Sequence, residues 1–456
     1  MIGFTLSELA RALPAEHIGA DARITGVDTD SRTVAPGRLF VALRGPRFDG
    51  HDFLEAAAER GASGALVAQR TSAALPCLRV ADTRLGLGRL GALWRQRSGA
   101  RLVAVTGSNG KTTVKEMLAS ILSQTAPTLA TQGNLNNDIG VPITLCRLQE
   151  EAFAVIEMGA NHPGEIGYLS RLARPQVAVL NNAGRAHLEG FGSVRAVARA
   201  KAEILEGLAP DGVFVFNADD PHAPLWRELA GDRPVLTFGV QRPADVSSPP
   251  GALELDWNGG AFHSAFPVQT PAGVFNVRLA LIGEHNRMNA LAAVAAAHAL
   301  GVGPQAMIEG LARLRPVKGR LTPRRAPEDV LVVDDSYNAN PESVRMAVEV
   351  LCRAPGRKLL VLGDLGELGA GAEGLHRELG LLARSRGVDL FFTCGRLSRA
   401  AAEAFGDGAR HFDAQESLVA ALRARLRPHD TVLVKGSRAA AMERVVEALC
   451  GEEGGC

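Results

Sequence analysis

The sequence predicts an α/β protein of three domains, and three observations support this. The chain has 456 residues, and at about 150 residues per domain this length favours three domains. Short apolar runs alternate with helical patterns, which is typical of parallel sheets covered by helices. Two composition breaks divide the chain, a polar stretch at 96–99 and a segment at 315–329 that is rich in Pro and Arg. We therefore expect domains at 1–99, 100–314 and 315–456.

Composition excludes several classes of protein. A hydrophobic fraction of 46% can bury real cores, so disorder is excluded. The formal net charge is +1, so no global basic field exists to hold nucleic acid, and any phosphate chemistry must be local. The six cysteines are scattered without a CxxC pair, which indicates reduced thiols rather than a disulfide framework or a zinc site.

No segment indicates export or a membrane span. The N-terminus has no basic region before its first apolar stretch, so it is not a signal peptide. The most apolar segment, 291–300, is far shorter than the ~20 residues that a membrane span needs. We expect a soluble, cytoplasmic protein.

The elements are expected in the following order. The first hundred residues are mixed α/β, without chemistry evident from the pattern. The central part begins with a strand at 102–106, a Gly-rich loop and a helix to 122, and continues with strands at 154–158 and 177–181. Residues 253–282 predict a small antiparallel patch, with a hairpin turn at Asn258-Gly259-Gly260.

The last part predicts a Rossmann-like open sheet. Its strands are expected at 330–335, 358–364, 389–395 and 431–436, with helices between them at 341–352 and 439–449 among others. The Pro- and Arg-rich segment before it is expected to hold neither a helix nor a central strand.

The strongest local signal for chemistry is the run TGSNGKTT at 106–113, which follows an apolar strand and opens a helix. Glycines allow backbone N–H groups to converge on phosphate oxygens, and the helix N-terminus adds positive potential. Lys111 is expected to reach the β- and γ-phosphates, and the Thr112 hydroxyl to bind Mg²⁺. The spacing is not GxxxxGK[ST], because Val105 stands six residues before Lys111. An ordinary Gly-rich turn with a solvated lysine is the alternative.

Two further residues follow neighbouring strands. Glu157 ends the strand at 154–158, where a carboxylate points into the crevice that binds ligands in α/β sheets. Taken alone, such a Glu is more often a loop cap, but beside a phosphate loop we expect it to bind Mg²⁺ with Thr112. His187 follows the next strand. A lone His is usually structural, and its position after that strand makes it a candidate metal ligand.

Lys201 lies on an apolar helix face. It shares that face with Val197, Ile204 and Leu208 at helical spacing. Burial of a lysine cation is unfavourable, so its pKa should fall. Either the ammonium reaches water or a carboxylate, or the neutral amine reacts with CO₂ to give a carbamate that binds metal through two oxygens.

Three polar clusters stand where parallel strands would place a crevice, at 133–137, 283–289 and 334–341. Each alone could be turn chemistry or a helix N-cap. Their recurrence in one chain favours a shared site.

These motifs resemble those of a known family. The runs TGSNGKTT, GNLNNDIGVP, EMGANHPGEI, AHLEGFGS, AKAEI, GEHNRMNALAA, KGR, DDSYNANP and KGSRAAAME occur in the order found in the Mur ligases of peptidoglycan synthesis. The resemblance covers essentially the whole chain, including TDSR at 29–32 and FDGH at 48–51. Within the family, DDSYNANP, NLNNDIGVP and HLEGFGS are most similar to the branch that adds D-alanyl-D-alanine.

The resemblance implies three functional parts. The first domain would hold the UDP of UDP-N-acetylmuramoyl-tripeptide, the central domain would bind MgATP, and the third would close over both and bring the dipeptide. The residues implied for the substrate are Ser31, Arg32, Asp49, His51, Asn134, Asn136 and Asn137. Those implied for ATP are Gly107, Ser108, Asn109, Gly110, Lys111, Thr112, Thr113, Asn289, Arg320 and Asp335.

The resemblance also implies two Mg²⁺ ions, one held by Thr112 and Glu157, the other by His187 and carbamylated Lys201. The catalytic set is then Lys111, Glu157, His187 and Lys201. The implied reaction activates the tripeptide carboxylate as an acyl phosphate, which the amine of D-alanyl-D-alanine attacks. We expect a monomer.

Two kinds of alternative remain. One is another ligase of similar sequence, which adds a diamino acid to the same precursor or glutamate to folate. The other is a phosphate-loop switch in which ATP hydrolysis drives binding, and the neutral charge and the absent GxxxxGK[ST] weigh against it.

Overall fold

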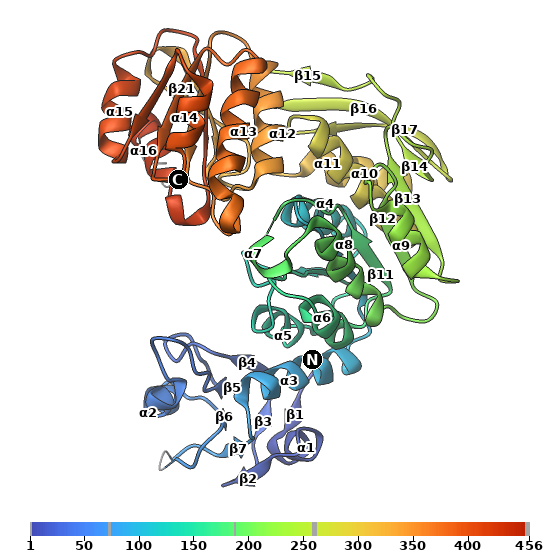
Figure 1. The fold of residues 1–456 in the computed structure, drawn as a ribbon. Coiled ribbons are helices and arrows are strands. Elements are labelled where there is room, and N and C mark those ends of the chain that lie inside the picture. The colour runs from blue at the N-terminus through green and yellow to red at the C-terminus, as the bar shows by residue number, and fades with distance from the viewer. Residues whose placement is uncertain (1, 72–73, 187, 258–261, 452–456) are drawn as a thin grey trace.

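The computed structural model describes residues 2–71, 74–186, 188–257 and 262–451. These residues form three α/β regions that follow one another along an open arc (Figure 1). The N-terminal region lies at one end, the C-terminal region at the other, and the central region joins them. The predicted fold class is confirmed.

The N-terminal region contains a mixed sheet. In the described residues its strand order is β2-β7-β6-β5-β4, parallel except for β2, and a short antiparallel pair, β1-β3, lies beside it. The strands are β1 (Phe4–Thr5), β2 (Glu16–Ile18), β3 (Arg23–Ile24), β4 (Gly26–Asp28), β5 (Arg38–Val41), β6 (Gly64–Val67) and β7 (Cys77–Arg79). The helices are α1 (Leu6–Ala12), α2 (Leu54–Glu59) and α3 (Thr83–Arg97).

The central region contains a mostly parallel sheet with the expected antiparallel patch. Its order in the described residues is β15-β16-β14-β13-β12-β11-β8-β10-β9, with β17 also paired to β16. The parallel strands are β8 (Arg101–Thr106), β9 (Thr128–Ala130), β10 (Phe153–Glu157), β11 (Val177–Leu180), β12 (Val213–Asn217), β13 (Val235–Gly239) and β14 (Val246–Ser247). The antiparallel ones are β15 (Glu254–Asp256), β16 (His263–Thr270) and β17 (Gly273–Leu279). The turn predicted at 258–260 lies outside the described residues.

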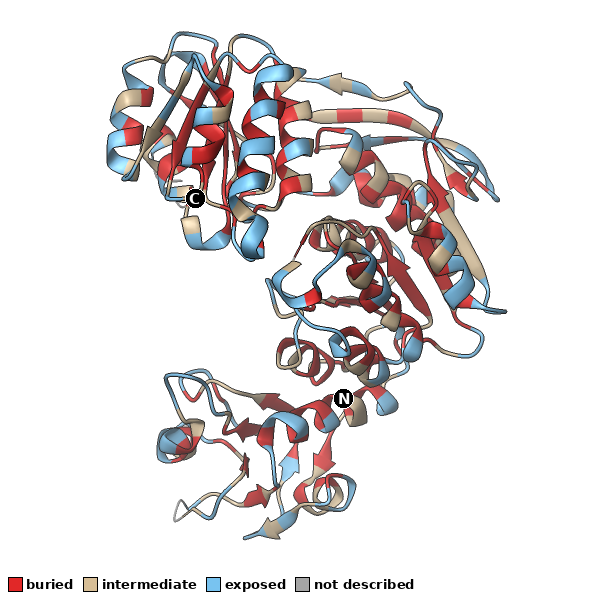
Figure 2. Ribbon diagram, in the orientation of Figure 1, coloured by how far each residue is buried: buried red, intermediate tan, exposed pale blue. Residues whose placement is uncertain are grey.

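Helices cover both faces of the parallel part of this sheet, so β8, β10 and β11 are buried, whereas β15 and β17 are more exposed (Figure 2). The helices are α4 (Lys111–Leu122), α5 (Gly140–Leu145), α6 (Glu165–Ala173), α7 (Leu188–Phe191), α8 (Val194–Ala202), α9 (Ala223–Ala230), α10 (Glu284–Ala299) and α11 (Pro304–Arg313). Val103 and Val105 of β8 pack on one side with α4 and α10, and Leu102 and Ala104 on the other. This alternation follows from the two-residue period of a strand.

The C-terminal region contains a second parallel sheet. Its order in the described residues is β18-β19-β23-β20-β21-β22, with β18 antiparallel. The strands are β18 (Thr322–Ala326), β19 (Val330–Asp335), β20 (Lys358–Gly363), β21 (Leu390–Cys394), β22 (Ala409–Phe412) and β23 (Thr431–Lys435). The helices are α12 (Pro341–Cys352), α13 (Ala372–Ser385), α14 (Arg399–Phe405), α15 (Gln415–Arg423) and α16 (Glu443–Cys450).

Two helices differ from the prediction. The helix expected at 439–449 is a 3₁₀ turn, Arg438–Ala440, followed by α16, because Ala441 takes a left-handed conformation with φ 47°. α8 ends at Ala202 and continues as a 3₁₀ turn, Glu203–Glu206. The segment predicted to hold neither a helix nor a central strand contains β18, which lies at the sheet edge, where Pro323 is tolerated.

Among the described residues, no helix is long and apolar enough to cross a membrane. Cys77, Cys146, Cys352, Cys394 and Cys450 form no disulfide.

Candidate active site

A cavity of ≈ 1800 Å³ is lined by residues of all three regions. The N-terminal region contributes the start of α3, Asp82 to Leu85. The central region contributes the loop before α4 and the carboxyl ends of β10 and β11, and the C-terminal region contributes the segments after β19 and β23. Within each of the two sheets, these segments lie together because the carboxyl ends of neighbouring parallel strands share one edge.

The loop at 106–110 is held in an open conformation by its neighbours. Gly110 is the N-cap of α4 with φ 79°, and a Cβ there would lie 2.2 Å from the Asn289 side chain. Only glycine fits both requirements. The Asn109 backbone N–H donates to Asn182 Oδ1 at 2.8 Å, and its carbonyl accepts from Asn181 Nδ2 at 2.9 Å. The carboxyl end of β11 therefore shapes the loop.

Lys111 begins α4 and folds back over this loop. Its Nζ donates to the carbonyl oxygen of Gly107 at 2.8 Å. Burial lowers the pKa of Lys111, an effect that the charge of Glu157 opposes. The protein itself supplies little negative charge to the Lys111 ammonium, so this group can bind a phosphate oxygen.

Glu157 ends β10 and has one carboxylate oxygen without a partner. Oε1 accepts from Asn136 Nδ2 at 2.8 Å, and the backbone N–H donates to Thr131 Oγ1 at 3.0 Å. Oε2 is buried and makes no hydrogen bond. A buried, unpaired carboxylate oxygen is unfavourable unless a cation binds it.

The donor set near Glu157 fits Mg²⁺. Both Thr112 and Glu157 line the cavity. No group of three or more His, Cys, Asp or Glu in the described part of the chain could hold a metal. Mg²⁺ commonly uses one or two protein ligands together with waters and substrate phosphates.

Lys201 is buried as predicted, with 1% of its surface exposed. Burial, with a smaller contribution from Lys111, lowers its pKa to about 7. Nζ lies 5.7 Å from the centre of the Phe191 ring. Lys201 does not line the cavity in this structure.

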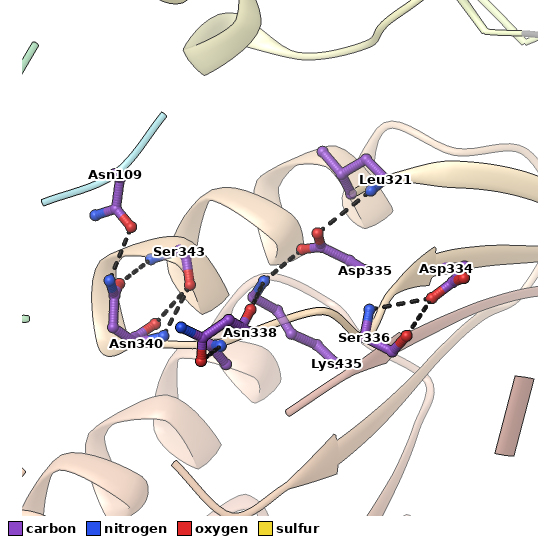
Figure 3. A network of polar contacts seen from close by, with 10 residues as sticks. Asn109, Leu321, Asp334, Asp335, Ser336, Asn338, Asn340, Ser343 and Lys435 are labelled. Carbon is purple, nitrogen blue, oxygen red and sulfur yellow. Dashed lines mark hydrogen bonds and ion pairs between the residues drawn. The ribbon is translucent and has the colours of Figure 1, made fainter. Parts of the chain in front are cut away.

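The residues expected to hold adenosine lie on both sides of the cavity. Asn289, on α10, accepts from Asn181 Nδ2 at 2.9 Å. Asp335, at the end of β19, forms an ion pair with Lys435 at 2.6 Å, and burial raises the pKa of Asp335. Figure 3 shows this pair beside Asn338, whose carbonyl accepts from Lys435 at 3.0 Å.

Arg320 reaches the phosphate loop from the segment that joins the central and C-terminal regions. Its Nη2 donates to Thr112 Oγ1 at 3.0 Å, and its guanidinium lies 4.6 Å from the centre of the Tyr337 ring. A cation beside the first turn of α4 adds to the positive potential there.

The four residues predicted for the nucleotide of the substrate lie apart from this cavity, in the N-terminal region. They follow β4 and β5, which are parallel neighbours, so they share one sheet edge. Ser31 is buried and Arg32 pairs with Asp30 at the surface.

His51 and Asp49 are hydrogen-bonded to each other. His51 Nδ1 lies 2.5 Å from Asp49 Oδ1, and His51 Nε2 accepts from the Ala68 N–H at 2.9 Å. Hydrogen bonds from the His51 backbone and ring lower the pKa of Asp49 to about 2. With both ring nitrogens engaged, His51 fixes the loop, and Asp49 remains charged.

Comparison with known proteins identifies the family. Residues 23–83 match the Mur ligase family catalytic domain, residues 105–297 the Mur ligase middle domain, and residues 319–438 the Mur ligase glutamate ligase domain. The chain is 47% identical, over the full length of both chains, to UDP-N-acetylmuramoyl-tripeptide–D-alanyl-D-alanine ligase of Escherichia coli strain K12. The chain belongs to the Mur ligase family.

Solved Mur ligase structures share the fold. MurF from Acinetobacter baumannii superposes with a TM-score of 0.92 at 39% identity and covers 99% of both chains. MurF from Thermotoga maritima, determined in complex with ADP, gives 0.83 at 32% identity and covers 93% of this chain and 96% of that one.

The structure brings together most of the residues predicted for ATP and metal, and three of those predicted for the substrate. Ser108, Asn109, Gly110, Lys111, Thr112, Thr113, Asn134, Asn136, Asn137, Glu157, Asn289, Arg320 and Asp335 line the cavity of this Mur ligase. Gly107 belongs to the same loop but does not line the cavity, and its carbonyl accepts from Lys111. His187 lies outside the described residues.

Sequence reasoning missed Asn181 and Asn182, which support the phosphate loop. Asn181 ends the strand predicted at 177–181 and Asn182 follows it, and polar residues at this strand end were a usable signal. It also missed Arg185, which joins the central and C-terminal regions through Glu342 and Glu378. No local pattern marks Arg185, because it meets Glu342 and Glu378 only in the folded chain.

Proposed function

We propose that this Mur ligase joins D-alanyl-D-alanine to UDP-N-acetylmuramoyl-tripeptide with conversion of ATP to ADP and phosphate. The observation that carries the proposal is a cavity shared by three regions, which is lined both by Lys111 and by Glu157, whose Oε2 has no partner. Relatives with that printed name, at 47% and 38% identity over nearly whole chains, support the choice of amine substrate.

ATP is needed because a carboxylate is a poor acyl donor. The tripeptide carboxylate attacks the γ-phosphate, which gives an acyl phosphate and ADP. The dipeptide amine then attacks the acyl carbon and expels phosphate. Lys111 and Arg320 stabilise the charge that builds as two anions approach, and the loop N–H groups position the phosphates.

Thr112 and Glu157 are proposed to hold one Mg²⁺, and His187 with carbamylated Lys201 a second. When bound, the two ions neutralise phosphate charge. Asn136 binds Oε1 of Glu157 and Thr131 its backbone N–H, which leaves Oε2 for the metal.

The carbamate proposal for Lys201 rests on burial. Its pKa of about 7 leaves much of the amine neutral at physiological pH, and the neutral amine is the form that attacks CO₂. The product is an anion at a position where an ammonium would repel a neighbouring metal.

The remaining parts of the proposal concern substrates and organisation. Ser31, Arg32 and Asp49 would contact the UDP-sugar, with His51 as support, and Asn134, Asn136 and Asn137 would lie beside the peptide. Asn289 and Asp335 would hold the adenosine. We propose domains at 1–99, 100–314 and 315–456, action as a monomer, and a cytoplasmic location.

The proposal is tested by the dependence of ADP formation on substrates. Both UDP-N-acetylmuramoyl-tripeptide and D-alanyl-D-alanine should be required, and L-alanyl-L-alanine should be inactive. Tripeptides that end in lysine and in meso-diaminopimelate are tested side by side.

Turnover with meso-diaminopimelate or glutamate as the amine would assign the chain to another ligase. Steady ADP formation without any amine or tripeptide would instead support the switch hypothesis.

A further inference from the structure

Arg185 joins the central region to two helices of the C-terminal region. It lies in the loop between β11 and α7. Its Nε donates to Glu342 Oε1 at 2.6 Å, and its backbone N–H donates to Glu342 Oε2 at 3.0 Å. Its Nη1 donates to Glu378 Oε2 at 3.0 Å. One arginine thus binds both α12 and α13, 157 and 193 residues away in sequence.

These ion pairs are partly shielded from solvent. The side chains of Arg185 and Glu342 are 27% and 29% exposed, whereas that of Glu378 is 55% exposed. The pair with Glu342 also engages both carboxylate oxygens. Because fixed and partly desolvated pairs contribute more than mobile surface pairs, Glu342 should be the stronger partner.

The ion pairs stand between two cavities. Arg185 lines the large cavity, and Glu378 lines a second one of ≈ 720 Å³. The second cavity lies between the segment 188–192 of the central region and the segment 368–378 of the C-terminal region. The ion pair of Arg185 with Glu378 therefore joins the linings of the two cavities, which also share Leu368.

The N-terminus of α12 makes a second contact with the central region. Asn340, its N-cap, donates from Nδ2 to Asn109 Oδ1 at 2.8 Å in the phosphate loop (Figure 3). Glu342 follows in the first turn of the same helix. One helix terminus thus contacts both the phosphate loop and the loop after β11.

We propose that Arg185, Glu342 and Glu378 form a latch between the central and C-terminal regions that keeps water from the acyl phosphate until the amine attacks. This inference rests on the proposed function. The three are positioning residues: they hold two walls of the cavity together and fix the loop at 184–186, without contact with the reacting atoms.

The latch has a specific kinetic consequence. An acyl phosphate partitions between attack by the amine and attack by water, and a closed cavity favours the amine. A weakened latch should therefore raise the amount of ADP formed per amide bond. Loss of fold alone would lower the formation of ADP and amide together and leave their ratio unchanged.

The test measures ADP and amide product for Glu342→Gln, with Glu349→Gln as the matched control. Glu349 lies on the same helix and pairs with Arg386 at 2.8 Å within the C-terminal region. The wild-type enzyme and the control should form about one ADP per amide. Glu342→Gln should raise this ratio about threefold to tenfold, most strongly at low dipeptide concentration.

A double-mutant cycle separates the latch from independent effects. If Arg185 and Glu342 act together, the double variant Arg185→Gln/Glu342→Gln should form no more ADP per amide bond than Arg185→Gln alone. Glu378→Gln should raise the amount of ADP per amide bond less than Glu342→Gln does, because Glu378 is more exposed. Additive effects, or a ratio near one in Glu342→Gln, would overturn the proposal.

Failure of the proposed function gives a different result. In that case the wild-type enzyme itself forms no amide from D-alanyl-D-alanine. A wild-type enzyme that forms the amide, beside a Glu342→Gln variant with unchanged coupling, rejects the latch alone.

Discussion

Lys111 combines a buried ammonium with hydrogen bonds to carbonyl oxygens of its own loop, Gly107 and Ser108. This arrangement keeps the charge near the position of a bound phosphate. Lys111→Ala should lower turnover by about two orders of magnitude or more, because a charge-stabilising group is lost from the transition state. Single-turnover ADP formation measures the effect.

The same variant should keep its affinity for the UDP-substrate, because the residues proposed for that ligand lie in another region. Calorimetric titration checks this. Loss of both activity and UDP-substrate binding would indicate a shared site or a misfolded protein.

Lys201→Ala tests the carbamate at the residue scale. The variant should fold normally, because the buried amine is replaced by a smaller apolar group, yet it should lose most activity. Formate or acetate should restore part of that activity in a concentration-dependent way, since each carboxylate supplies two oxygens to the vacated space.

Rescue should fade with bulkier acids. Full activity of the variant, or mass spectrometry and a structure that show an unmodified Lys201 in the active metal-loaded enzyme, would contradict the carbamate.

At the scale of elements, His376 on α13 fixes the loop that lines the cavity at 366–368. His376 Nε2 accepts from the Leu365 N–H at 3.1 Å, and Nδ1 lies 2.7 Å from the Ala372 carbonyl oxygen. Nδ1 therefore carries the proton of a neutral ring. Burial lowers the pKa of His376 below its ordinary value of 6.5.

This geometry predicts a pH-dependent loop. The loop is closed when the Leu365 N–H is bonded to His376, and open when this bond is broken. Below pH 6.5 His376 binds a proton in the open loop but not in the closed one, so the closed form loses stability as the pH falls. Hydrogen exchange of the Leu365 amide, corrected for its intrinsic rate, should show less protection at pH 5 than at pH 7.5. In His376→Gln the protection should vary little with pH, and an equal pH dependence in this variant would reject the assignment.

The helices also show which element bounds a local sequence pattern can predict. α12 has the predicted bounds, 341–352, because Asn340 caps it and Pro341 starts it. The predicted start of the last helix, at residue 439, was wrong, because the left-handed Ala441 interrupts a sequence with good helix propensity. Such an interruption is set by the packing of Ala440 and Met442 against Gly363 and Gly436 rather than by local preference.

At the scale of the whole molecule, Arg95 fixes α3 to the central region. It is 7% exposed. Nε donates to the Ala173 carbonyl at 2.7 Å, Nη1 to the Ala100 carbonyl at 3.0 Å, and Nη2 to Gln176 Oε1 at 3.2 Å. Arg95→Met keeps the apolar stem but leaves several buried acceptors unpaired.

Arg95→Met should lower the free energy of unfolding by about 2–4 kcal/mol and speed proteolytic cleavage near residues 98–100. Arg97→Met serves as the control, since Arg97 binds Gly3 and Glu8 within the N-terminal region. Equal cleavage rates in the two variants would contradict a role of Arg95 in the junction.

The sequence by itself determined the fold class, the Gly-rich loop before a helix, the place of Lys201 on an apolar helix face and the position of Glu157 at a strand end. Each depends on short-range information: strand and helix periods, glycine conformations, and polar residues at strand ends. Family membership followed from the order of these motifs and was confirmed by comparison.

Only the tertiary structure decided which oxygen of Glu157 is unpaired, that His51 supports Asp49, and that Arg185 meets Glu342 and Glu378. The contacts of Glu157 and Arg185 join residues on different elements, in the case of Arg185 more than 150 positions apart, whereas Asp49 and His51 are neighbours in one turn. Their geometry depends on how whole regions pack, and no local pattern in the chain records that packing.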